Sequence, residues 1–433
     1  MRILMANYRY FVSGGPERYL FTVSDALRGA GHSVIPFSVS YPQNEPTSYA
    51  RYFVQPLDSS GAVYFRDHGH DLRTFARTLS RLFYSKEVEI AVRRLAAETR
   101  PDVAYVLHFL RKLSPSLLVG LKRAGVPIVV RLSDYQMFCP QAHFVRRGEV
   151  CTRCLGGSVF PAAAYGCVRS SRIVSLLDGL ATTYHRWRRF FDLIDLFIVT
   201  NPFAQQVAQQ AGISAERLVC LPTPVDLRDV APKSADERRD VLVYVGRLDP
   251  IKGVETLIAA FSRLRTRREF RGYRLIFCGE GEPDYEAHLH DLCRTTGSTE
   301  SVEFRGKVSR SEVFQILGEV RASIVPSAWF ENFPNAVLES FAAGTPVVAT
   351  RLGSLEAMVE EGVTGTLFRR EDAEDLERVL CELLSNPERL ASMGEQARAA
   401  AVEKYSVNEH VNRLLDQFEV LRAAGGTRAK PTA

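Results

Sequence analysis

The sequence of 433 residues lacks the long apolar stretches that membrane-spanning proteins carry. It contains no run of about 18 or more apolar residues, so we expect no transmembrane helix. The start of the chain, MRILMANYRY, also lacks the charged leader and apolar core of a secretory signal peptide. These two absences predict a cytoplasmic protein, most of whose thiols are reduced.

A strong excess of charge of one sign is missing as well. The chain has 55 Lys and Arg residues against 50 Asp and Glu residues, and the net charge of +5 is spread along it. This is too mild to predict a nucleic-acid partner, although a local basic patch could still contact an anionic membrane. Apolar residues make up 46% of the chain, which is ordinary for a globular protein, and the length predicts two domains.

The sequence also lacks the G-x-G-x-x-G fingerprint of dinucleotide-binding proteins, so an NAD-type oxidoreductase is not favoured. Instead, an apolar strand over residues 2–6 is followed by Gly14 and Gly15, a helical pattern, and a second strand over residues 33–37. This is a βαβ opening. The glycine pair would let the backbone approach a ligand closely, and a simple tight turn explains it equally well.

The best-defined motif is the stretch 329–350, WFENFPNAVLESFAAGTPVVAT. Apolar runs at residues 322–325 and 346–349 predict two buried strands. A helix is expected between them, from about Pro334 to residue 343, because proline suits a helix start and Gly344 suits its end. The unit is half of a parallel sheet, and the N–H groups near Phe333 and Asn335 would face an anion such as a phosphate.

Two carboxylates bracket this predicted anion site. Glu331 lies in the loop and Glu339 lies eight residues further on, inside the helix. At that spacing they would reach different parts of one long ligand, such as sugar hydroxyls on either side of a diphosphate. The alternative is that Glu331 is solvated and Glu339 pairs on the helix surface, but the flanking loop and helix favour the ligand.

The βαβ pattern restarts at residues 241–245, which marks a second domain. The loop after this strand holds Arg247 and Lys252, five residues apart and well placed for a diphosphate, although two surface cations would look the same. Gly279 follows the next strand, at the edge of the sheet where ligands of such folds bind.

Four of the eight cysteines, Cys139, Cys151, Cys154 and Cys167, fall within a short segment. The C-x2-C spacing of Cys151 and Cys154 is typical of half a structural zinc site, which Cys139 and Cys167 would complete, with His143 as a substitute ligand. Free thiols and an iron–sulfur cluster are alternatives, and zinc and no metal are equally favoured. A catalytic zinc is not expected, because four cysteines leave no open position.

Two basic segments suggest a surface role. Residues 71–99 predict one arginine-rich helical run, and residues 169–191 mix arginines with aromatic residues. A helix that is solvated or packed on its own domain is the commoner explanation. The alternative is a surface that faces the acceptor or lies on a membrane, which would place the protein at the inner face of the membrane.

Together, these motifs resemble those of the retaining glycosyltransferases of family 4, the glycosyl transferases group 1. The resemblance extends to V-G-R-L-D-P-x-K-G around Arg247 and Lys252, and to GG-x-E-x-Y from Gly14 to Tyr19. The family pattern E-x-F-P-N-x-x-L-E is matched in full by Glu331, Phe333, Pro334, Asn335, Leu338 and Glu339. One departure is Ser133, which stands before Asp134 where family members often have histidine; His108 could compensate, although a lone histidine at a strand end is more often simply packed.

The resemblance implies the α/β GT-B fold, in which two Rossmann-like domains face a cleft and a C-terminal helix crosses back to the N-terminal domain. Residues 1–222 would form the acceptor-binding domain, with the cysteine-bearing insert at 139–167. Residues 223–404 would bind the nucleotide sugar, residues 405–423 would form the crossover helix, and residues 424–433 would be a disordered tail.

The implied function is the transfer of a hexose, with retention of configuration, from a nucleotide diphosphate sugar to a hydroxyl of a glycan or lipid-linked acceptor. Glu331, Arg247 and Lys252 would be catalytic, and no cofactor would be required. The donor would be bound by Gly14, Gly15, Gly279, Lys307, Val308, Asn332, Phe333, Pro334, Asn335 and Glu339, with Lys307 and Val308 near the nucleotide base.

Other functions compatible with the fold remain open. One is a non-catalytic sugar-nucleotide-binding protein or a scaffold of glycan assembly, and another is a GT-B sugar epimerase. A phosphorylase would require a pyridoxal-binding lysine, which the sequence does not reveal.

Overall fold

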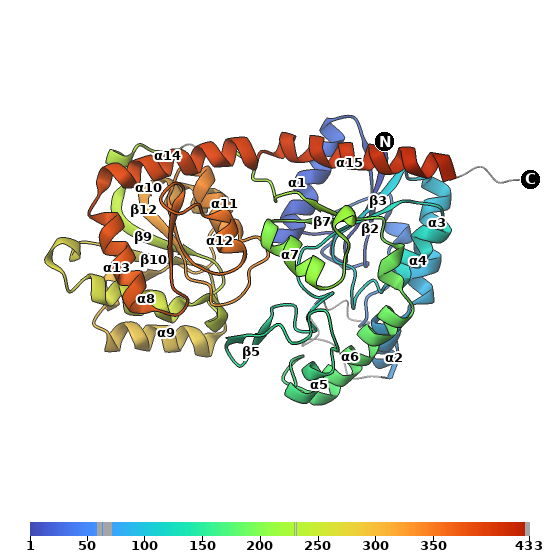
Figure 1. The fold of residues 1–433 in the computed structure, drawn as a ribbon, viewed down its shortest axis with the longest axis horizontal. Helices are drawn as coiled ribbons and strands as arrows, with labels where there is room; N and C mark the ends of the chain where they lie inside the picture. The colour runs from blue at the N-terminus through green and yellow to red at the C-terminus, as the bar shows by residue number, and fades with distance from the viewer. Residues whose placement is uncertain (59–62, 64–71, 229, 231, 429–433) are drawn as a thin grey trace, which may run out of the picture.

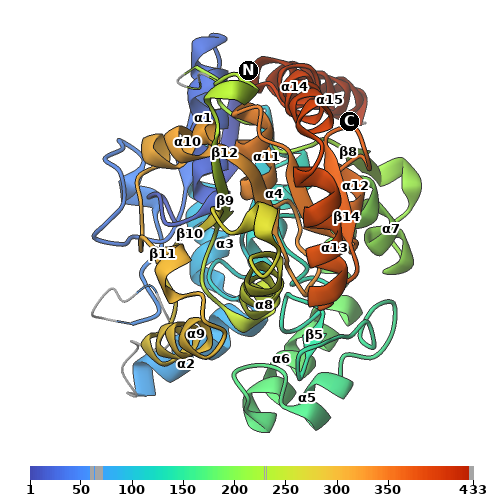
Figure 2. The ribbon, with the colours of Figure 1, turned by 90° about the vertical axis from the view of Figure 1, so that its left-hand side faces the viewer.

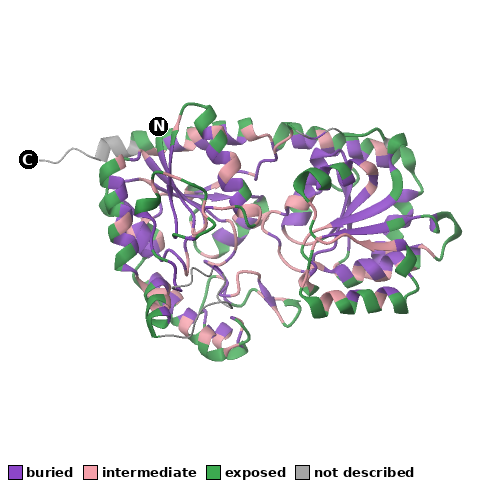
Figure 3. Cartoon of the chain, turned by 180° about the vertical axis from the view of Figure 1, so that it is seen from behind, coloured by how far each residue is buried: buried purple, intermediate pink, exposed green. Residues whose placement is uncertain are grey.

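The computed structural model describes residues 1–58, 63, 72–228, 230 and 232–428. The chain forms two lobes, each built on a parallel sheet of six strands with helices on both faces (Figure 1). The strands are short, and their residues are almost all apolar and buried (Figure 3). Near-continuous apolar runs of this kind are typical of parallel strands covered on both faces, so the two α/β domains predicted from the sequence are confirmed.

The sheet of the first lobe has the strand order β2-β1-β3-β4-β7-β8. Alternate residues of one strand enter different cores: Leu4 and Ala6 pack on one face of the sheet, Ile3 and Met5 on the other. The strands are β1 (Arg2–Ala6), β2 (Ser33–Phe37), β3 (Val103–Val106), β4 (Ile128–Arg131), β7 (Leu196–Val199) and β8 (Leu218–Cys220). The helices are α1 (Gly15–Gly29), α2 (Leu72–Phe83), α3 (Lys86–Thr99), α4 (Ser116–Arg123), α5 (Pro161–Tyr165), α6 (Arg172–Trp187) and α7 (Pro202–Gln210).

The sheet of the second lobe has the order β11-β10-β9-β12-β13-β14, which is the Rossmann order. Helices α8, α9 and α13 cover one face, and α10, α11 and α14 cover the other (Figure 2). The strands are β9 (Arg239–Val245), β10 (Arg274–Cys278), β11 (Val302–Phe304), β12 (Val320–Val325), β13 (Val347–Thr350) and β14 (Gly365–Phe368). The helices are α8 (Val254–Leu264), α9 (Pro283–Thr295), α10 (Arg310–Glu319), α11 (Asn335–Ala342), α12 (Ser354–Met358), α13 (Ala373–Leu384) and α14 (Pro387–Lys404).

Residues 72–99 are almost entirely helical, as predicted, but not as one run. The segment forms two helices, α2 and α3, separated at Tyr84 and Ser85. The side chain of Ser85 accepts a hydrogen bond from the backbone N–H of Val88 and so caps a new helix, a role that serine fills better than a helix interior. Residue 71 lies outside the described residues.

The cysteine-bearing segment lies at the lower edge of the first lobe in Figure 1. It contains a two-stranded antiparallel hairpin of β5 (Val145–Arg146) and β6 (Glu149–Val150), followed by α5 and α6. The hairpin reaches toward the second lobe, and Glu149 forms an ion pair with Arg370 at 2.7 Å.

The last helix, α15 (Val407–Arg428), leaves the second lobe and packs on α1 of the first, as predicted (Figure 1). It is anchored by His410, which lies 2.8 Å from the hydroxyl of Tyr19 and 2.7 Å from the carbonyl oxygen of Pro222. The helix runs to residue 428, so the predicted start of the tail at 424 is wrong, and residues 429–433 lie outside the described residues. In the described part of the chain, no helix is both long and apolar enough to cross a bilayer.

Candidate active site

The candidate site lies where the two sheets face each other. In each sheet the strand order reverses beside the first strand, at β1/β3 and at β9/β12, and ligands of such folds bind beyond the carboxyl ends of these strands. A cavity of about 180 Å³ opens there between the lobes. It is lined by Gly15, Pro16, Tyr19, Arg131, Ser133, Asp134, Tyr135, Ala142, His143, Thr223, Trp329, Glu331, Asn332, Phe333 and Asn335.

Glu331 is the centre of the polar network in this cavity and is only 7% exposed. Its Oε1 atom accepts from Lys252 Nζ at 2.5 Å, Ser327 Oγ at 2.7 Å and Trp329 Nε1 at 3.1 Å. Lys252 also lies over the indole ring of Trp329, 4.9 Å from the ring centroid. Among the described residues no hydrogen bond ends on Oε2, which is therefore available to a ligand.

Arg247 stands apart from this network. Its guanidinium forms an ion pair with Asp249 at 2.8 Å, and 60% of its side chain is exposed. The structure therefore places the two predicted cations differently: Lys252 is bonded to Glu331, which lines the cavity, and Arg247 is mostly exposed to solvent.

The loop that carries Glu331 is fastened to the first lobe by backbone and side-chain hydrogen bonds. Asn332 accepts from Thr200 Oγ1 at 2.6 Å through Oδ1, and donates from Nδ2 to the carbonyl oxygen of Leu132 at 2.8 Å. The backbone oxygen of Glu331 accepts from the hydroxyl of Tyr135 at 3.0 Å. Asn332, predicted to bind the donor, thus has its amide engaged in a contact between the lobes.

Gly15 and Asn335 meet across the cavity. A Cβ atom on Gly15 would lie 2.6 Å from Asn335 Nδ2, so a larger residue here would have to displace the Asn335 side chain. Gly14 has extended backbone and caps α1, and a Cβ there would meet only ordinary contacts. Pro334 precedes α11 as its N-cap, and its neighbour Phe333 packs edge-on against the ring of Tyr405.

Glu339 lies on the other side of this contact. A smaller cavity of about 30 Å³ is lined by Glu339 and shares Gly15 and Asn335 with the first. Burial raises the pKa of Glu339. The positive charges of Arg18 and Arg310 lower this pKa, but by less than burial raises it. Arg18 lies 3.3 Å from its Oε1. The two glutamates therefore face different cavities joined at the start of α11, as their spacing predicts.

The remaining predicted donor residues line neighbouring turns at the same sheet edge. Gly279 donates its backbone N–H to the carbonyl oxygen of Gly306 at 2.8 Å. Its φ is +151°, and a Cβ would lie 1.8 Å from the carbonyl oxygen of Gly246, so packing of these turns alone requires glycine. Lys307 is exposed. Val308 packs against the core between the sheet of the second lobe and helices α10, α11 and α14.

Sequence reasoning missed the part played by His143, which it considered only as a substitute metal ligand. Its ring packs edge-on against Trp329, with the centroids 4.6 Å apart, and it lines the main cavity. Burial lowers its pKa, so the imidazole is neutral at pH 7. The ring lies in the cysteine-bearing segment, and no local motif marked it.

The structure shows where His108 lies, whereas its compensation for Ser133 stays a prediction. His108 Nε2 lies 3.3 Å from Asp134 Oδ2, so the histidine supplied by the end of β3 pairs with the aspartate at the end of β4. Burial alone would raise the pKa of Asp134, but hydrogen bonding and charge from His108 outweigh it and lower the pKa. Asp134 is therefore ionised in the cavity wall.

The four cysteines of the insert are free thiols in the structure. They lie close enough to affect one another: burial raises the pKa of Cys154 to about 11, and the other three thiols affect it as well. Among the described residues, however, no group of three or more His, Cys, Asp or Glu side chains is placed to hold a metal ion. The zinc site therefore stays a prediction from the spacing, without support from the geometry.

Comparison with known proteins gives a family match for the second lobe. Residues 227–400 match the model of the family described as glycosyl transferases group 1. The chain is 31% identical over 212 residues to D-inositol 3-phosphate glycosyltransferase 2 of Catenulispora acidiphila, which is 46% of this chain and 49% of that protein. The chain thus spans about half the length of this curated relative.

Two solved structures share the fold over nearly the full chain. Sucrose-phosphate synthase of Thermosynechococcus elongatus has a TM-score of 0.71 at 18% identity, over 98% of this chain and 99% of that one. Anabaena Alr3699/HepE in complex with UDP and glucose has a TM-score of 0.65 at 18% identity, over 97% of this chain and 100% of that one. The predicted GT-B fold is confirmed. The family match, over residues 227–400, includes the loops that carry Lys252, Glu331 and Glu339.

Proposed function

We propose that this chain is a retaining glycosyltransferase that moves a hexose from a nucleotide diphosphate sugar to a hydroxyl of a glycan or lipid-linked acceptor. The observation that carries the proposal is the contact of the partly buried Lys252 with the buried Glu331, which lies where the switch points of two sheets face each other. The family match over residues 227–400 supports transfer of a sugar, and the bound UDP and glucose of Alr3699/HepE support a nucleotide sugar as donor.

In this proposal the donor spans both cavities. Its hexose would occupy the space beside Glu331, whose free Oε2 would accept from sugar hydroxyls. Its ribose would lie beside Glu339, with the diphosphate between them at the start of α11. Backbone N–H groups at a helix N-terminus favour an anion there, and Gly15 lets the facing loop come close.

The reaction needs charge stabilisation at two places. As the anomeric C–O bond breaks, negative charge grows on the diphosphate and positive charge on the sugar ring. Lys252 and the start of α11 would stabilise the first, joined by Arg247 once it leaves Asp249, and Glu331 would face the second. The acceptor oxygen forms the new bond on the same face of the ring, and its proton passes to the leaving phosphate oxygen, which preserves the configuration.

The test is a thermal-shift panel of nucleotide sugars on the wild type, Lys252→Ala and Lys233→Ala. Lys233 is the matched control, because it also forms an ion pair, with Glu319 at 2.9 Å, but lies outside the cavity. A donor at about 100 times its dissociation constant should stabilise the native state by about 2.7 kcal/mol. We expect one nucleotide sugar to raise the melting temperature of the wild type and Lys233→Ala but not of Lys252→Ala.

If no nucleotide sugar raises the melting temperature of the wild type, the transferase proposal is refuted and a scaffold role is favoured. If a donor is found, the anomeric configuration of the transfer product, measured by proton NMR, decides between retention and inversion.

A further inference from the structure

Helix α6 reverses the usual arrangement of apolar and polar residues. A surface helix of a globular protein normally turns its large apolar side chains toward the core and its polar side chains toward solvent. In α6 the buried residues are small or polar, namely Ser175, Asp178, Gly179, Ala181 and His185. Packing in the first lobe therefore does not explain the large apolar side chains on the opposite face.

This opposite face carries a mostly apolar stripe. We define the α6 stripe as Ile173, Leu176, Leu180, Thr183 and Trp187, which follow one another at alternating spacings of three and four residues and so lie along one side of the helix. Ile173 is 74% exposed, Trp187 is 73% exposed, and the two leucines are exposed as well. Large apolar residues gathered on one exposed face indicate a surface that a partner covers.

Helix α5 extends this surface. It packs on α6 at the lower edge of the first lobe (Figure 1). Phe160, just before α5, and Tyr165, at its end, are both exposed. The ring of Tyr165 is contacted by the guanidinium groups of Arg146 and Arg153, which lie 4.4 Å and 5.5 Å from its centroid. Apolar and cationic groups thus lie side by side on this part of the molecule.

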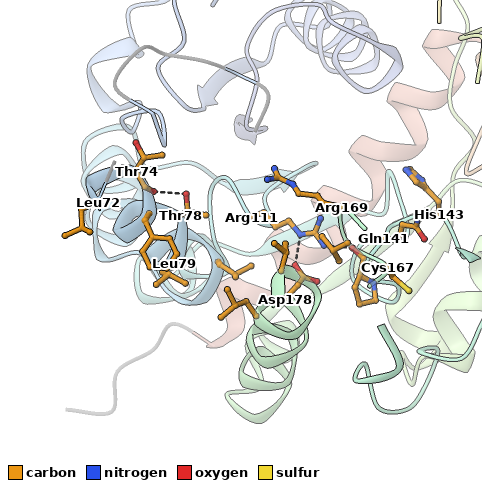
Figure 4. Close-up of a pocket in the computed structure, with 16 residues that line it drawn as sticks. Leu72, Thr74, Thr78, Leu79, Arg111, Gln141, His143, Cys167, Arg169 and Asp178 are labelled. Atoms are coloured by element: carbon orange, nitrogen blue, oxygen red, sulfur yellow. Dashed lines mark hydrogen bonds and ion pairs between the residues drawn. The ribbon is translucent and has the colours of Figure 1, made fainter. Parts of the chain in front are cut away.

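A groove of about 770 Å³ lies behind the stripe, between α2, α6 and the cysteine-bearing segment (Figure 4). Arg111 and Asp178 in its wall form an ion pair with each other at 2.8 Å. Two residues of α2 in its lining, Leu72 and Phe75, are themselves exposed, so the groove opens at the surface. Its apolar lining includes Leu72, Phe75, Leu79, Leu82, Val174 and Leu177.

The segment that contains this surface is strongly basic. Residues 139–190 include eight arginines and only two acidic residues, so their charge exceeds the net charge of +5 of the whole chain. Both acidic residues are bonded to arginines outside the segment: Glu149 pairs with Arg370 at 2.7 Å, and Asp178 pairs with Arg111. Positive charge is therefore concentrated around α5 and α6.

Two arginines stand at the ends of the α6 stripe. Arg172 lies at its start and Arg188 directly after its end, and both are exposed. Neither forms an ion pair with any residue that the structure describes. Arg189, by contrast, is paired with Asp192. The stripe is thus flanked by two cations that face solvent.

These charges disfavour a second copy of the chain as the partner. If two α6 stripes packed face to face, Arg172 and Arg188 would meet other arginines whether the helices ran parallel or antiparallel, and like charges in contact are unfavourable. The one acidic residue of α6, Asp178, is buried on the opposite face. A bilayer of anionic lipid instead offers negative charge at its surface and an apolar interior.

We propose that the α6 stripe, together with α5 and the start of α2, lies on the surface of an anionic phospholipid bilayer. The apolar side chains enter the boundary between headgroups and acyl chains, and Arg172 and Arg188 contact lipid phosphates. Trp187 suits this position, because tryptophan is enriched at the interface between membrane and water. The proposal goes beyond the transferase function proposed above and does not depend on it.

The experiment measures co-sedimentation of the full chain with vesicles of equal parts phosphatidylglycerol and phosphatidylcholine. Vesicles of phosphatidylcholine alone are the uncharged comparison. We expect the chain to bind the anionic vesicles at least tenfold more tightly. Raising the salt concentration from about 0.1 M to about 1 M should weaken this binding, because the screening length falls from about 10 Å to about 3 Å.

Two double variants separate the apolar and the cationic contributions. Ile173→Gln with Trp187→Gln makes the stripe polar, and Arg172→Gln with Arg188→Gln removes the flanking charges. Each should weaken binding to the anionic vesicles at least tenfold. All four side chains are exposed, so both variants should melt at the wild-type temperature.

Matched controls change equivalent residues elsewhere on the surface. Val402→Gln with Val420→Gln replaces two exposed apolar residues of α14 and α15, at the opposite edge of the molecule in Figure 1. Arg268→Gln with Arg271→Gln removes two exposed arginines of the second lobe, neither of which forms an ion pair with a described residue. Both controls should bind the vesicles as the wild type does.

Fluorescence tests the same surface without altering it. The chain has two tryptophans, Trp187 and Trp329, so Trp329→Phe leaves Trp187 as the only one. Its emission should shift to shorter wavelength with anionic vesicles and be quenched by lipids that carry bromine on their acyl chains.

No binding to anionic vesicles, equal binding to both kinds of vesicle, or wild-type binding by both stripe and arginine variants would overturn the proposal. Unchanged Trp187 emission on bound vesicles would overturn it too, because another face would then contact the lipid. The same holds if the wild type is a dimer that the stripe variant converts to a monomer, since a second copy would then cover the stripe. None of these measurements uses a nucleotide sugar, so their outcome is separate from that of the thermal-shift panel.

Discussion

Asn332 has two possible roles that an experiment can separate. The sequence predicts that it binds the donor, whereas in the structure its side-chain amide forms hydrogen bonds between the two lobes. Asn332→Ala removes the hydrogen bonds to Thr200 at 2.6 Å and to the Leu132 carbonyl at 2.8 Å. At about 1 kcal/mol for each bond, the closed arrangement of the lobes should lose about 2 kcal/mol relative to an open one. Since 1.4 kcal/mol is a factor of ten, the closed population should fall by a factor of about 30 relative to the open one.

The assay is the distance between fluorophores on the exposed faces of α3 and α9, measured by single-molecule energy transfer without ligand. We expect a second, longer distance in Asn332→Ala, and the same in Thr200→Val to about half the extent. Asn332→Asp keeps the acceptor for Thr200 but loses the donor to Leu132, and should be intermediate. If the distance is unchanged in Asn332→Ala while the affinity for the donor falls, the reasoning is refuted. Asn332 would then contact the donor directly.

Three further predictions concern individual contacts. Gly15→Ala should weaken donor binding at least tenfold in titration calorimetry, because its Cβ would lie 2.6 Å from Asn335 Nδ2, whereas Gly14→Ala should bind normally; equal effects would contradict this. Lys252→Ala leaves the Glu331 carboxylate buried without its cation and should lower the free energy of unfolding in urea by about 3 kcal/mol, and adding Glu331→Gln should restore at least half. Burial lowers the pKa of His410 to about 3, so the unfolded state binds more protons below pH 6.5. The contribution of His410 to the free energy of unfolding should therefore be constant above that pH and fall by about 1.4 kcal/mol for each pH unit below it, so His410→Gln should reduce the slope of the profile between pH 6 and 5.

The βαβ periodicity allowed two α/β domains to be predicted, because parallel strands buried on both faces leave continuous apolar runs. The GT-B arrangement of these domains was implied by the family resemblance. The spacing of Glu331 and Glu339 likewise predicted that they face different parts of the site. The sequence could not show that the amide of Asn332 is held by the other lobe or that His108 pairs with Asp134, because these contacts join segments far apart in the chain. The place of His143 depended on the path of the cysteine-bearing segment, which follows neither helical nor strand periodicity.

The two chain connections between the lobes lie side by side. The backbone N–H of Val225, on the outgoing connection, donates to the carbonyl oxygen of Tyr405 at 2.8 Å on the returning one, and Val225 pairs with Ser406 as a parallel bridge. Because the two connections are bonded to each other, both pass from lobe to lobe at one place, and we expect the lobes to open by rotation about this place. Opening the site is then a lever motion, in which a small change at Val225 and Tyr405 becomes a larger displacement at the loop of Glu331.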